Sequence, residues 1–382
     1  MPIVEKDGAY FFPAYFGRFI DSLASEVRRL ILFAHRSDSP CDQADYQLSQ
    51  TNIELVLLPE KKSSPSLLLN HRRFTRMFKA YEKDLDAFLV RGPTTLMPFI
   101  AESLKQTPIV FLMVGDHLEG LKSSKLASLR KFFIGKFWQF IYKRIERKLP
   151  EVMVIANSEK LFEKYEKKAS RIARTRTTTI TEDDLWIRED TCTGDLIQLL
   201  YCGRIARQKG LEDIIEAVCL LRQEILPVSL SIVGWEESGD GFLRALSQLI
   251  DEKGLTQNIK LLGYLPVGER LFQKYRESDV FVLASRSSFE GFPRVLWEAM
   301  ANCLPIVSTN VGSIPEYVGH FIDLVPPNDP VLLAEAIKKV ILNREYRKKI
   351  IRTGFNLVQD ITLEKQTRQL VTLIEDHANH SK

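Results

Sequence analysis

The sequence contains little cysteine and histidine, and no long apolar run. Its five cysteines among 382 residues are odd in number and lack paired spacing: Cys41, Cys192, Cys202, Cys219 and Cys303. This pattern predicts reduced thiols and argues against a disulfide framework or a zinc site. The six histidines show no metal-ligand spacing either. No stretch reaches the roughly 18 apolar residues that a membrane-spanning helix needs. We therefore expect no membrane-spanning helix.

A secretion signal is not expected either. The N-terminal stretch MPIVEKDGAYFF carries Glu5 and Asp7 where a signal peptide would be basic. Together with the unpaired cysteines, this predicts a cytoplasmic protein. With 45% hydrophobic residues over 382 positions, the chain can bury two cores, which is the usual expectation at this length.

Basic residues are concentrated in one segment. Residues 121–150 hold nine Lys and Arg but one acidic residue, interspersed with aromatic and branched apolar residues. A basic helix with aromatic anchors can lie in a membrane interface and is attracted to anionic lipid. The segment therefore predicts peripheral membrane contact. The alternative places its apolar residues in the domain core beneath a cationic surface: Phe133, Phe137, Phe140 and Ile141. No nucleic-acid-binding motif accompanies the segment, so nucleic acid is not an expected partner.

Strand and helix patterns alternate in both halves of the chain. Expected strands in the first half are 30–34, 53–58, 87–90, 109–114 and 152–156; in the second half they are 196–202, 228–233, 258–262, 279–284, 304–308 and 321–325. Two such series predict two doubly wound α/β domains, 1–190 and 195–360, with a cleft between them. The acidic stretch Thr181 to Asp195 is the expected linker.

Two glutamates mark the second half. Glu290 and Glu298 stand eight residues apart around the turn Gly291-Phe292-Pro293, where a strand signal gives way to a helix with Pro near its first position. Eight residues at about 100° each return to within about 80° of the starting direction, so both carboxylates can line one cleft. Two carboxylate acceptors suit a polyhydroxylated ligand. The alternative is that Glu290 caps a turn and Glu298 is a solvated helix residue.

This segment resembles the E-x7-E motif of the family 4 retaining glycosyltransferases. The resemblance extends beyond the EGFP turn to the stretches EAMA, LPIV and VGSIPE that follow it. The resemblance implies the GT-B fold of two Rossmann-like domains facing across a cleft. It also implies that Glu290 holds hydroxyls of a donor sugar, that Glu298 holds the ribose of its nucleotide, and that the Gly291-Phe292-Pro293 turn belongs to the same site. Members usually return their last helix to the N-terminal domain, and residues 362–382 contain a matching helical pattern.

A basic loop upstream resembles the phosphate site of the same family. The stretch DLIQLLYCGRIARQKGLEDIIEAVCLL reads as a buried strand, a Gly-Arg turn, a basic loop and a helix. By resemblance, Arg204 and Lys209 neutralise the diphosphate of a nucleotide sugar, while Gly203 and Gly210 let the backbone approach it. Cations suit this place because the departing nucleoside diphosphate gains charge as the glycosidic bond breaks. The alternative is that both are ordinary surface cations.

The first half offers Asp116 and His117 at the end of the strand in PIVFLMVGDHLEG. Related enzymes place a side chain here beside the anomeric carbon or the acceptor hydroxyl. Asp116 is expected to accept a hydrogen bond from a sugar hydroxyl or to stabilise positive charge at the anomeric centre. In the retaining mechanism usually proposed for the family, the leaving phosphate takes the acceptor's proton, so no protein base is obligatory. The alternative is that Asp116 caps the next helix and His117 is solvated.

The chain departs from the family pattern in three places. The Gly-Gly turn that many members have after the first strand has its nearest match in Phe16-Gly17-Arg18. A Pro-Asn-Gly turn common before the second domain is replaced by Thr181-Glu182-Asp183-Asp184. A Gly-x-Gly after the second strand of that domain is replaced by Gly234-Trp235-Glu236. A competing D-x-D motif, Asp84-Leu85-Asp86, precedes its strand, whereas the metal-binding motif of the other major glycosyltransferase fold follows one. No metal requirement is therefore expected.

Together with these observations, the resemblance implies a cytoplasmic, metal-independent, retaining hexosyltransferase. It is expected to use a UDP- or GDP-linked sugar as donor substrate, with no separate cofactor. The acceptor is expected to be a glycan or a lipid-linked sugar in surface polysaccharide synthesis at the inner face of the membrane. The alternatives are a nucleotide-sugar 2-epimerase of the same fold and a catalytically silent sugar-nucleotide-binding protein.

Overall fold

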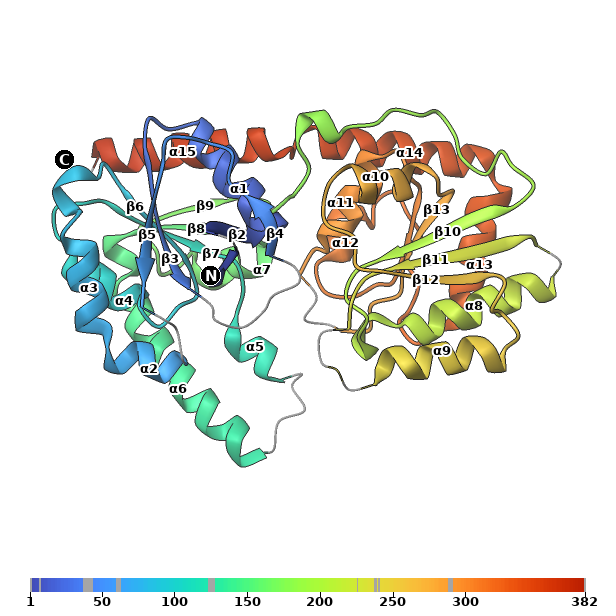
Figure 1. Cartoon of the computed structure of the whole chain (residues 1–382), viewed down its shortest axis with the longest axis horizontal. Coiled ribbons are helices and arrows are strands. Elements are labelled where there is room, and N and C mark those ends of the chain that lie inside the picture. The colour runs from blue at the N-terminus through green and yellow to red at the C-terminus, as the bar shows by residue number, and fades with distance from the viewer. Residues whose placement is uncertain are drawn as a thin grey trace. The chain divides into compact units, whose positions relative to one another are not determined.

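The computed structural model describes residues 2–6, 8–36, 44–59, 63–122, 128–224, 226–236, 239, 241–287 and 291–380. The chain divides into two compact units (Figure 1). Unit 1 contains Met1–Thr177 and Leu363–Lys382, and unit 2 contains Thr178–Thr362. The chain therefore crosses between the units twice, once on each side of unit 2. The four cysteines in the described part of the chain form no disulfide.

The strands of unit 1 form two hydrogen-bonded sheets. The first has the order β4 (Ala44–Gln47), β2 (Ala9–Pro13), β1 (Pro2–Lys6), β3 (Leu30–Arg36) and β5 (Ile53–Leu58); the second has the order β6 (Phe88–Gly92), β7 (Ile109–Met113), β8 (Met153–Ala156) and β9 (Arg171–Arg174). The second sheet is parallel throughout. β7 reads IVFLM and is buried along its whole length, as expected for a parallel strand covered on both faces.

Eight helices surround these sheets in the described part of unit 1. They are α1 (Ala14–Ser25), α2 (Ser64–Leu69), α3 (His71–Lys79), α4 (Met97–Ser103), α5 (His117–Lys122), α6 (Ser128–Glu146), α7 (Glu159–Tyr165) and α15 (Leu363–His380). α15 comes from the far end of the chain and packs beside α1, where the Ser22 and Thr367 hydroxyls lie 2.8 Å apart. The backbone N–H of Arg176 donates to Gln366 of α15 at 2.8 Å.

Unit 2 is a doubly wound parallel sheet. Its strand order is β12 (Ile259–Gly263), β11 (Val228–Val233), β10 (Ile197–Cys202), β13 (Val280–Leu283) and β14 (Ile306–Ser308). The helices are α8 (Leu211–Gln223), α9 (Phe242–Glu252), α10 (Glu269–Arg276), α11 (Arg294–Ala301), α12 (Ile314–Val318), α13 (Pro330–Leu342) and α14 (Arg344–Gln359). The chain order reverses at β10, and ligands of open α/β sheets bind beside such a reversal, at the carboxyl ends of the strands.

Most expected strands are present, and the differences have physical reasons. Residues 321–325 form no strand; Val325 only makes an isolated bridge with Thr309. The sequence analysis missed β1, β2, β4 and β9 because they are short and lie near sheet edges or in the antiparallel ribbon. The expected first-strand turn at Phe16-Gly17-Arg18 is wrong, since these residues lie inside α1. There, a Cβ on Gly17 would come 2.2 Å from Tyr46 Cδ1.

The acidic stretch expected as a linker is anchored on unit 2. The Arg188 guanidinium donates to the carbonyls of Cys303, Arg276, Tyr275 and Ser278, and Asp190 pairs with Arg347 at 2.7 Å. Thr181 and Asp184 close a capping box at a short 3-10 turn in place of the Pro-Asn-Gly turn. The crossing from unit 1 therefore lies earlier, before Thr178.

Candidate functional site

The basic loop of unit 2 follows its central strand. β10 ends at Cys202, and Gly203 then adopts a φ of +146°. The Tyr201 hydroxyl donates to the Arg204 carbonyl at 2.7 Å, which fixes the start of the loop. Gly210 ends the loop in the left-handed region, with a φ of +65°, as the residue before α8. A Cβ on Gly210 would lie 2.0 Å from the Ala284 carbonyl oxygen, so only glycine fits there.

Arg204 and Lys209 lie in the loop between β10 and α8. Lys209 ends a 3-10 turn, Arg207–Lys209, and is only 8% exposed, so it is not an ordinary surface cation. Arg204 is half-buried. The loop leads directly into α8, a helix of 13 residues whose N-terminal N–H groups and dipole favour negative charge. Two cations and a helix N-terminus are thus gathered at the carboxyl end of β10.

Arg286 stabilises this loop, and the sequence analysis did not single it out. It follows β13, and its guanidinium donates to the Asp213 carboxylate at 2.7 and 2.9 Å. Its backbone N–H donates to the Gln208 carbonyl at 2.8 Å. The hydrogen bond to Asp213 is the main cause of the raised pKa of Arg286. Because two carboxylates of α8 neutralise its charge, Arg286 holds the loop in place and is not itself a candidate phosphate ligand.

The turn before α11 is well anchored on its C-terminal side. Glu290 lies outside the described residues. The Phe292 ring packs on Trp297 and Tyr317, with ring centroids 4.0 and 4.7 Å apart. Pro293 immediately precedes α11, the place that the sequence predicted for it. Gly291 is exposed and has no atom within 4 Å of a hypothetical Cβ.

Glu298 lies on α11 and is buried. Its residue is only 4% exposed, so the alternative of a solvated helix residue is wrong. Thr179 Oγ1 donates to one carboxylate oxygen at 2.9 Å, and the Tyr275 hydroxyl donates to the other at 2.8 Å. Neither partner was expected from the sequence, because they lie 119 and 23 residues away along the chain.

In unit 1, Asp116 has the structural role that the sequence analysis left open. Its carboxylate accepts the Leu118 N–H at 2.9 Å at the start of α5 and pairs with Lys164 at 2.5 Å. Burial by itself raises the pKa of Asp116, but the hydrogen bond and charge of Lys164 outweigh it and lower the pKa below its usual value. Asp116 is therefore an ionised helix cap with a cationic partner.

His117 is exposed beyond the end of β7. Its ring stacks on Trp138 with centroids 3.7 Å apart, and Nε2 lies 3.2 Å from the Pro93 carbonyl oxygen. The Tyr142 hydroxyl accepts the backbone N–H of His117 at 3.0 Å. The ring is therefore held in one orientation by an aromatic surface and a carbonyl. The alternative of a freely solvated His117 side chain is therefore wrong.

The D-x-D motif and the residues Asp116 and His117 lie at different strands of the second sheet of unit 1. Asp84 and Asp86 are exposed and precede β6, as the sequence predicted. In the described part of the chain, no three His, Cys, Asp or Glu side chains are arranged to hold a metal ion.

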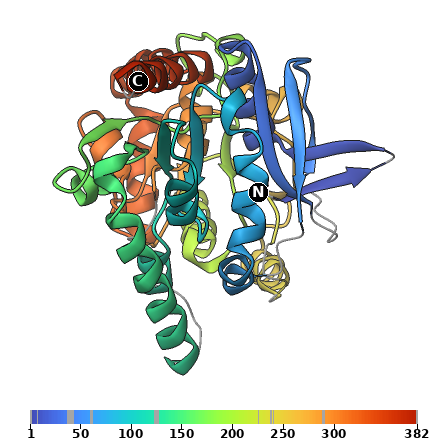
Figure 2. The ribbon, with the colours of Figure 1, turned by 90° about the vertical axis from the view of Figure 1, so that its left-hand side faces the viewer.

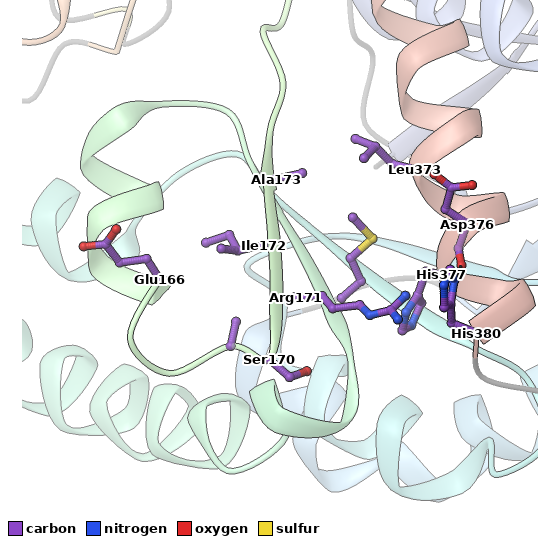
Figure 3. Close-up of a pocket in the computed structure, with 11 residues that line it drawn as sticks. Glu166, Ser170, Arg171, Ile172, Ala173, Leu373, Asp376, His377 and His380 are labelled. Carbon is purple, nitrogen blue, oxygen red and sulfur yellow. Dashed lines mark hydrogen bonds between the residues drawn. The ribbon is translucent and has the colours of Figure 1, made fainter.

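A pocket of about 570 Å³ lies elsewhere in unit 1, between β9 and the end of α15. Figure 3 shows the Arg171 side chain directed toward His377 and His380. Burial lowers the pKa of His377, and the charge of Arg171 lowers it further. None of the site residues predicted from the sequence lines this pocket.

Residues 128–146 of the basic segment form α6, whereas residues 123–127 lie outside the described residues. The N-terminal half of α6 extends away from the sheets of unit 1 (Figure 2). Trp138, Ile141, Tyr142 and Ile145 are buried on one face. The other face exposes large apolar side chains at helical spacing: Leu129 (71%), Phe132 (56%), Phe133 (63%) and Phe140 (47%). The alternative that placed apolar residues of this segment in the core is therefore wrong for Phe133 and Phe140. It is right for Ile141, which is fully buried, and Phe137 packs against the same core. Among the described residues, no helix combines the length and apolarity needed to span a bilayer.

Comparisons with known proteins agree with these observations. Residues 184–357 match the family model described as "Glycosyl transferases group 1". The amylovoran biosynthesis glycosyltransferase AmsK of Erwinia amylovora is 32% identical over 151 residues, 38% of this chain and 36% of that protein. The O-antigen chain mannosyltransferase B of Escherichia coli is 30% identical over 45% of this chain and 44% of its own length. The chain thus spans less than half of these relatives, and the resemblance to glycosyltransferases is confirmed over its second half.

Solved structures resemble the chain over nearly its whole length. The Anabaena protein HepE in complex with UDP has a TM-score of 0.70 at 16% identity, covering 96% of both chains. WaaG, a glycosyltransferase involved in lipopolysaccharide biosynthesis, has a TM-score of 0.61 at 14% identity, covering 95% of this chain and 97% of its own. At these identities the likeness shows the fold, which is GT-B with two Rossmann-like α/β units.

Proposed function

We propose that the chain is a retaining, family 4 glycosyltransferase that moves a hexose from a nucleotide-diphosphate sugar to a glycan or lipid-linked acceptor. One observation carries this proposal. In unit 2, a basic loop with a buried lysine opens α8 beside β10, and a buried carboxylate lies on the helix that follows the neighbouring strand β13. This arrangement suits a diphosphate and a diol of one ligand.

The residues have complementary tasks in this proposal. Arg204 and Lys209 stabilise the charge that grows on the nucleoside diphosphate as its bond to the sugar C1 breaks. Gly203 and Gly210 keep the loop backbone open to the phosphates, and Glu298 accepts the ribose hydroxyls. Glu290, through its place in the motif, binds hydroxyls of the sugar.

The proposed transfer keeps the anomeric configuration. The acceptor oxygen forms its bond to C1 on the face that the diphosphate leaves, and the acceptor proton passes to an oxygen of the departing phosphate. No protein base is needed, which agrees with Asp116 being engaged as a cap and ion pair. His117 is a proposed unit 1 contact with the sugar or the acceptor.

UDP- or GDP-linked sugars are the proposed donors. The solved neighbour HepE was crystallised with UDP and with UDP-glucose, which supports a nucleotide-sugar donor here. A thermal-shift panel of UDP, GDP, ADP and their sugars tests this, because a ligand that binds only the native state stabilises it by RT ln(1 + [L]/Kd). We expect one diphosphate to raise the Tm in a concentration-dependent manner. A panel without any shift at millimolar ligand would contradict the proposal.

Transfer should not require a divalent cation. The loop cations and the N-terminus of α8 supply the positive charge that a metal ion provides in other glycosyltransferases. We expect nucleoside diphosphate release from the donor to proceed at an unchanged rate in EDTA. Loss of activity in EDTA that Mn²⁺ or Mg²⁺ restores would instead return attention to Asp84 and Asp86.

The exposed face of α6 is the proposed membrane contact. Leu129, Phe132 and Phe133 can enter the interface of a bilayer, while neighbouring Lys136 and Lys143 meet anionic headgroups. Arg144 and Lys148 do not take part, because they pair with Glu102 and Glu151. Attachment at the inner face of a membrane suits a lipid-linked acceptor in surface polysaccharide synthesis, the process that the names of AmsK and O-antigen chain mannosyltransferase B also indicate.

A further inference from the structure

The surroundings of the Glu298 carboxylate are unusual for a buried acid. Each oxygen accepts one hydrogen bond from a neutral hydroxyl, Thr179 Oγ1 at 2.9 Å and the Tyr275 hydroxyl at 2.8 Å. Within the described part of the chain, no Lys, Arg or His forms an ion pair with Glu298. Burying a carboxylate without a cation is costly unless hydrogen bonds compensate, so the two hydroxyls matter for this carboxylate.

Both hydroxyls are held in fixed positions. Tyr275 lies on α10, is fully buried, and stacks on Phe281 with centroids 5.7 Å apart. Burial raises the pKa of Tyr275 well above its usual value, and the neighbouring Cys202 and Glu298 raise it further, so its hydroxyl stays a donor. Thr179 is buried and lies one residue after Thr178, the first residue of unit 2.

We propose that Thr179 and Tyr275 are positioning residues that turn the Glu298 carboxylate toward a vicinal diol of the ligand. Each carboxylate oxygen has two lone pairs, and each protein hydroxyl occupies one of them. One lone pair on each oxygen is then left for a ligand hydroxyl, which matches the two hydroxyls of a ribose. This inference rests on the proposed function, in which the ligand is a nucleoside diphosphate.

Thr179 lies next to the first crossing of the chain between the two units. The segment before it is tied to unit 1, where the Arg176 N–H donates to Gln366 of α15. The hydrogen bond from Thr179 to Glu298 therefore connects the first crossing between the units to the carboxylate that is proposed to bind the diol.

The test compares nucleotides with and without the diol. UDP, GDP and the 2′,3′-dideoxy form of each are titrated calorimetrically into wild type, Thr179→Val, Thr179→Ser and Tyr275→Phe. Tyr346→Phe is the matched control, because its hydroxyl accepts the Asp323 N–H at 2.8 Å without contacting Glu298. Hydrogen bonds to a charged acceptor should make wild type and control prefer the ribonucleotide by about 30-fold.

We expect Thr179→Val and Tyr275→Phe to reduce this preference below about fivefold while the Kd of the dideoxy form stays unchanged, and Thr179→Ser to restore it. A purely structural role would weaken both nucleotides equally. Equal weakening, or an undiminished preference in Thr179→Val, would overturn the inference. If Tyr275→Phe does not fold, the comparison of Thr179→Val with Thr179→Ser is sufficient to test the inference. Wild type that binds neither UDP nor GDP would overturn the proposed function, and this inference with it.

Discussion

Arg204→Ala and Lys209→Met should each lower turnover by at least about 100-fold, a loss of about 3 kcal/mol of transition-state stabilisation. The reason is that charge develops on the leaving diphosphate only as the glycosidic bond breaks, so a fixed cation acts mainly on the rate. Methionine keeps the buried stem of Lys209 and removes only its charge, which protects the fold. The measurement is nucleoside diphosphate release from the donor that the thermal-shift panel identifies.

The same loop supplies the control for this experiment. Arg207 is exposed, and its guanidinium lies over the Phe242 ring at 4.7 Å, so Arg207→Ala should change turnover less than about threefold. Melting temperatures close to that of wild type would show that all three variants are folded. Near wild-type turnover in Arg204→Ala or Lys209→Met would contradict the phosphate role of that residue.

Replacing Leu129, Phe132 and Phe133 together by Ser should weaken binding to anionic vesicles by at least about 100-fold, because each large apolar side chain contributes about 1.5–3 kcal/mol when fully buried. A second variant, Lys136→Gln with Lys143→Gln, should lose about 1 kcal/mol per cation, and only at low salt. Vesicle co-sedimentation across a salt series separates the two contributions. Donor binding should be unchanged in both variants, since the phosphate loop lies in unit 2.

The control for this surface uses exposed lysines on other elements of unit 1. The control variant replaces three lysines together by Gln: Lys79, Lys83 and Lys105. It removes more charge than the α6 cation variant, yet its vesicle binding should stay within about twofold of that of wild type. Neutral vesicles report the apolar contribution alone. Wild-type protein that stays in the supernatant with anionic vesicles at low salt would refute membrane contact and favour a soluble acceptor.

Local patterns predicted the parts of the fold that local physics determines. Residues 197–202 form a strand because they are mostly apolar, as in a parallel strand covered on both faces. Residues 228–233 form one because apolar residues alternate there with half-buried serines. Pro293 was placed correctly because a helix start has strong residue preferences. Glu298 was assigned to a helix that follows a strand, and it lies there.

Contacts between distant residues could not be read from these patterns. Nothing in the sequence near Thr179 or Tyr275 indicates that both bond to Glu298. Arg286 likewise gains its role from distant partners, among them Asp213, 73 residues away. The stretch Thr181 to Asp195 resembled a linker because it is polar. Its Arg188, however, binds four backbone carbonyls of unit 2 that only folding brings together.

A crystal structure of the chain with UDP or GDP, whichever binds more tightly, tests the central claim most directly. We predict diphosphate oxygens at about 2.7–3.2 Å from Arg204, Lys209 or the first N–H groups of α8. We also predict the ribose hydroxyls on the Glu298 carboxylate. A nucleotide bound elsewhere, or an empty loop at a concentration that saturates binding in solution, would contradict the account.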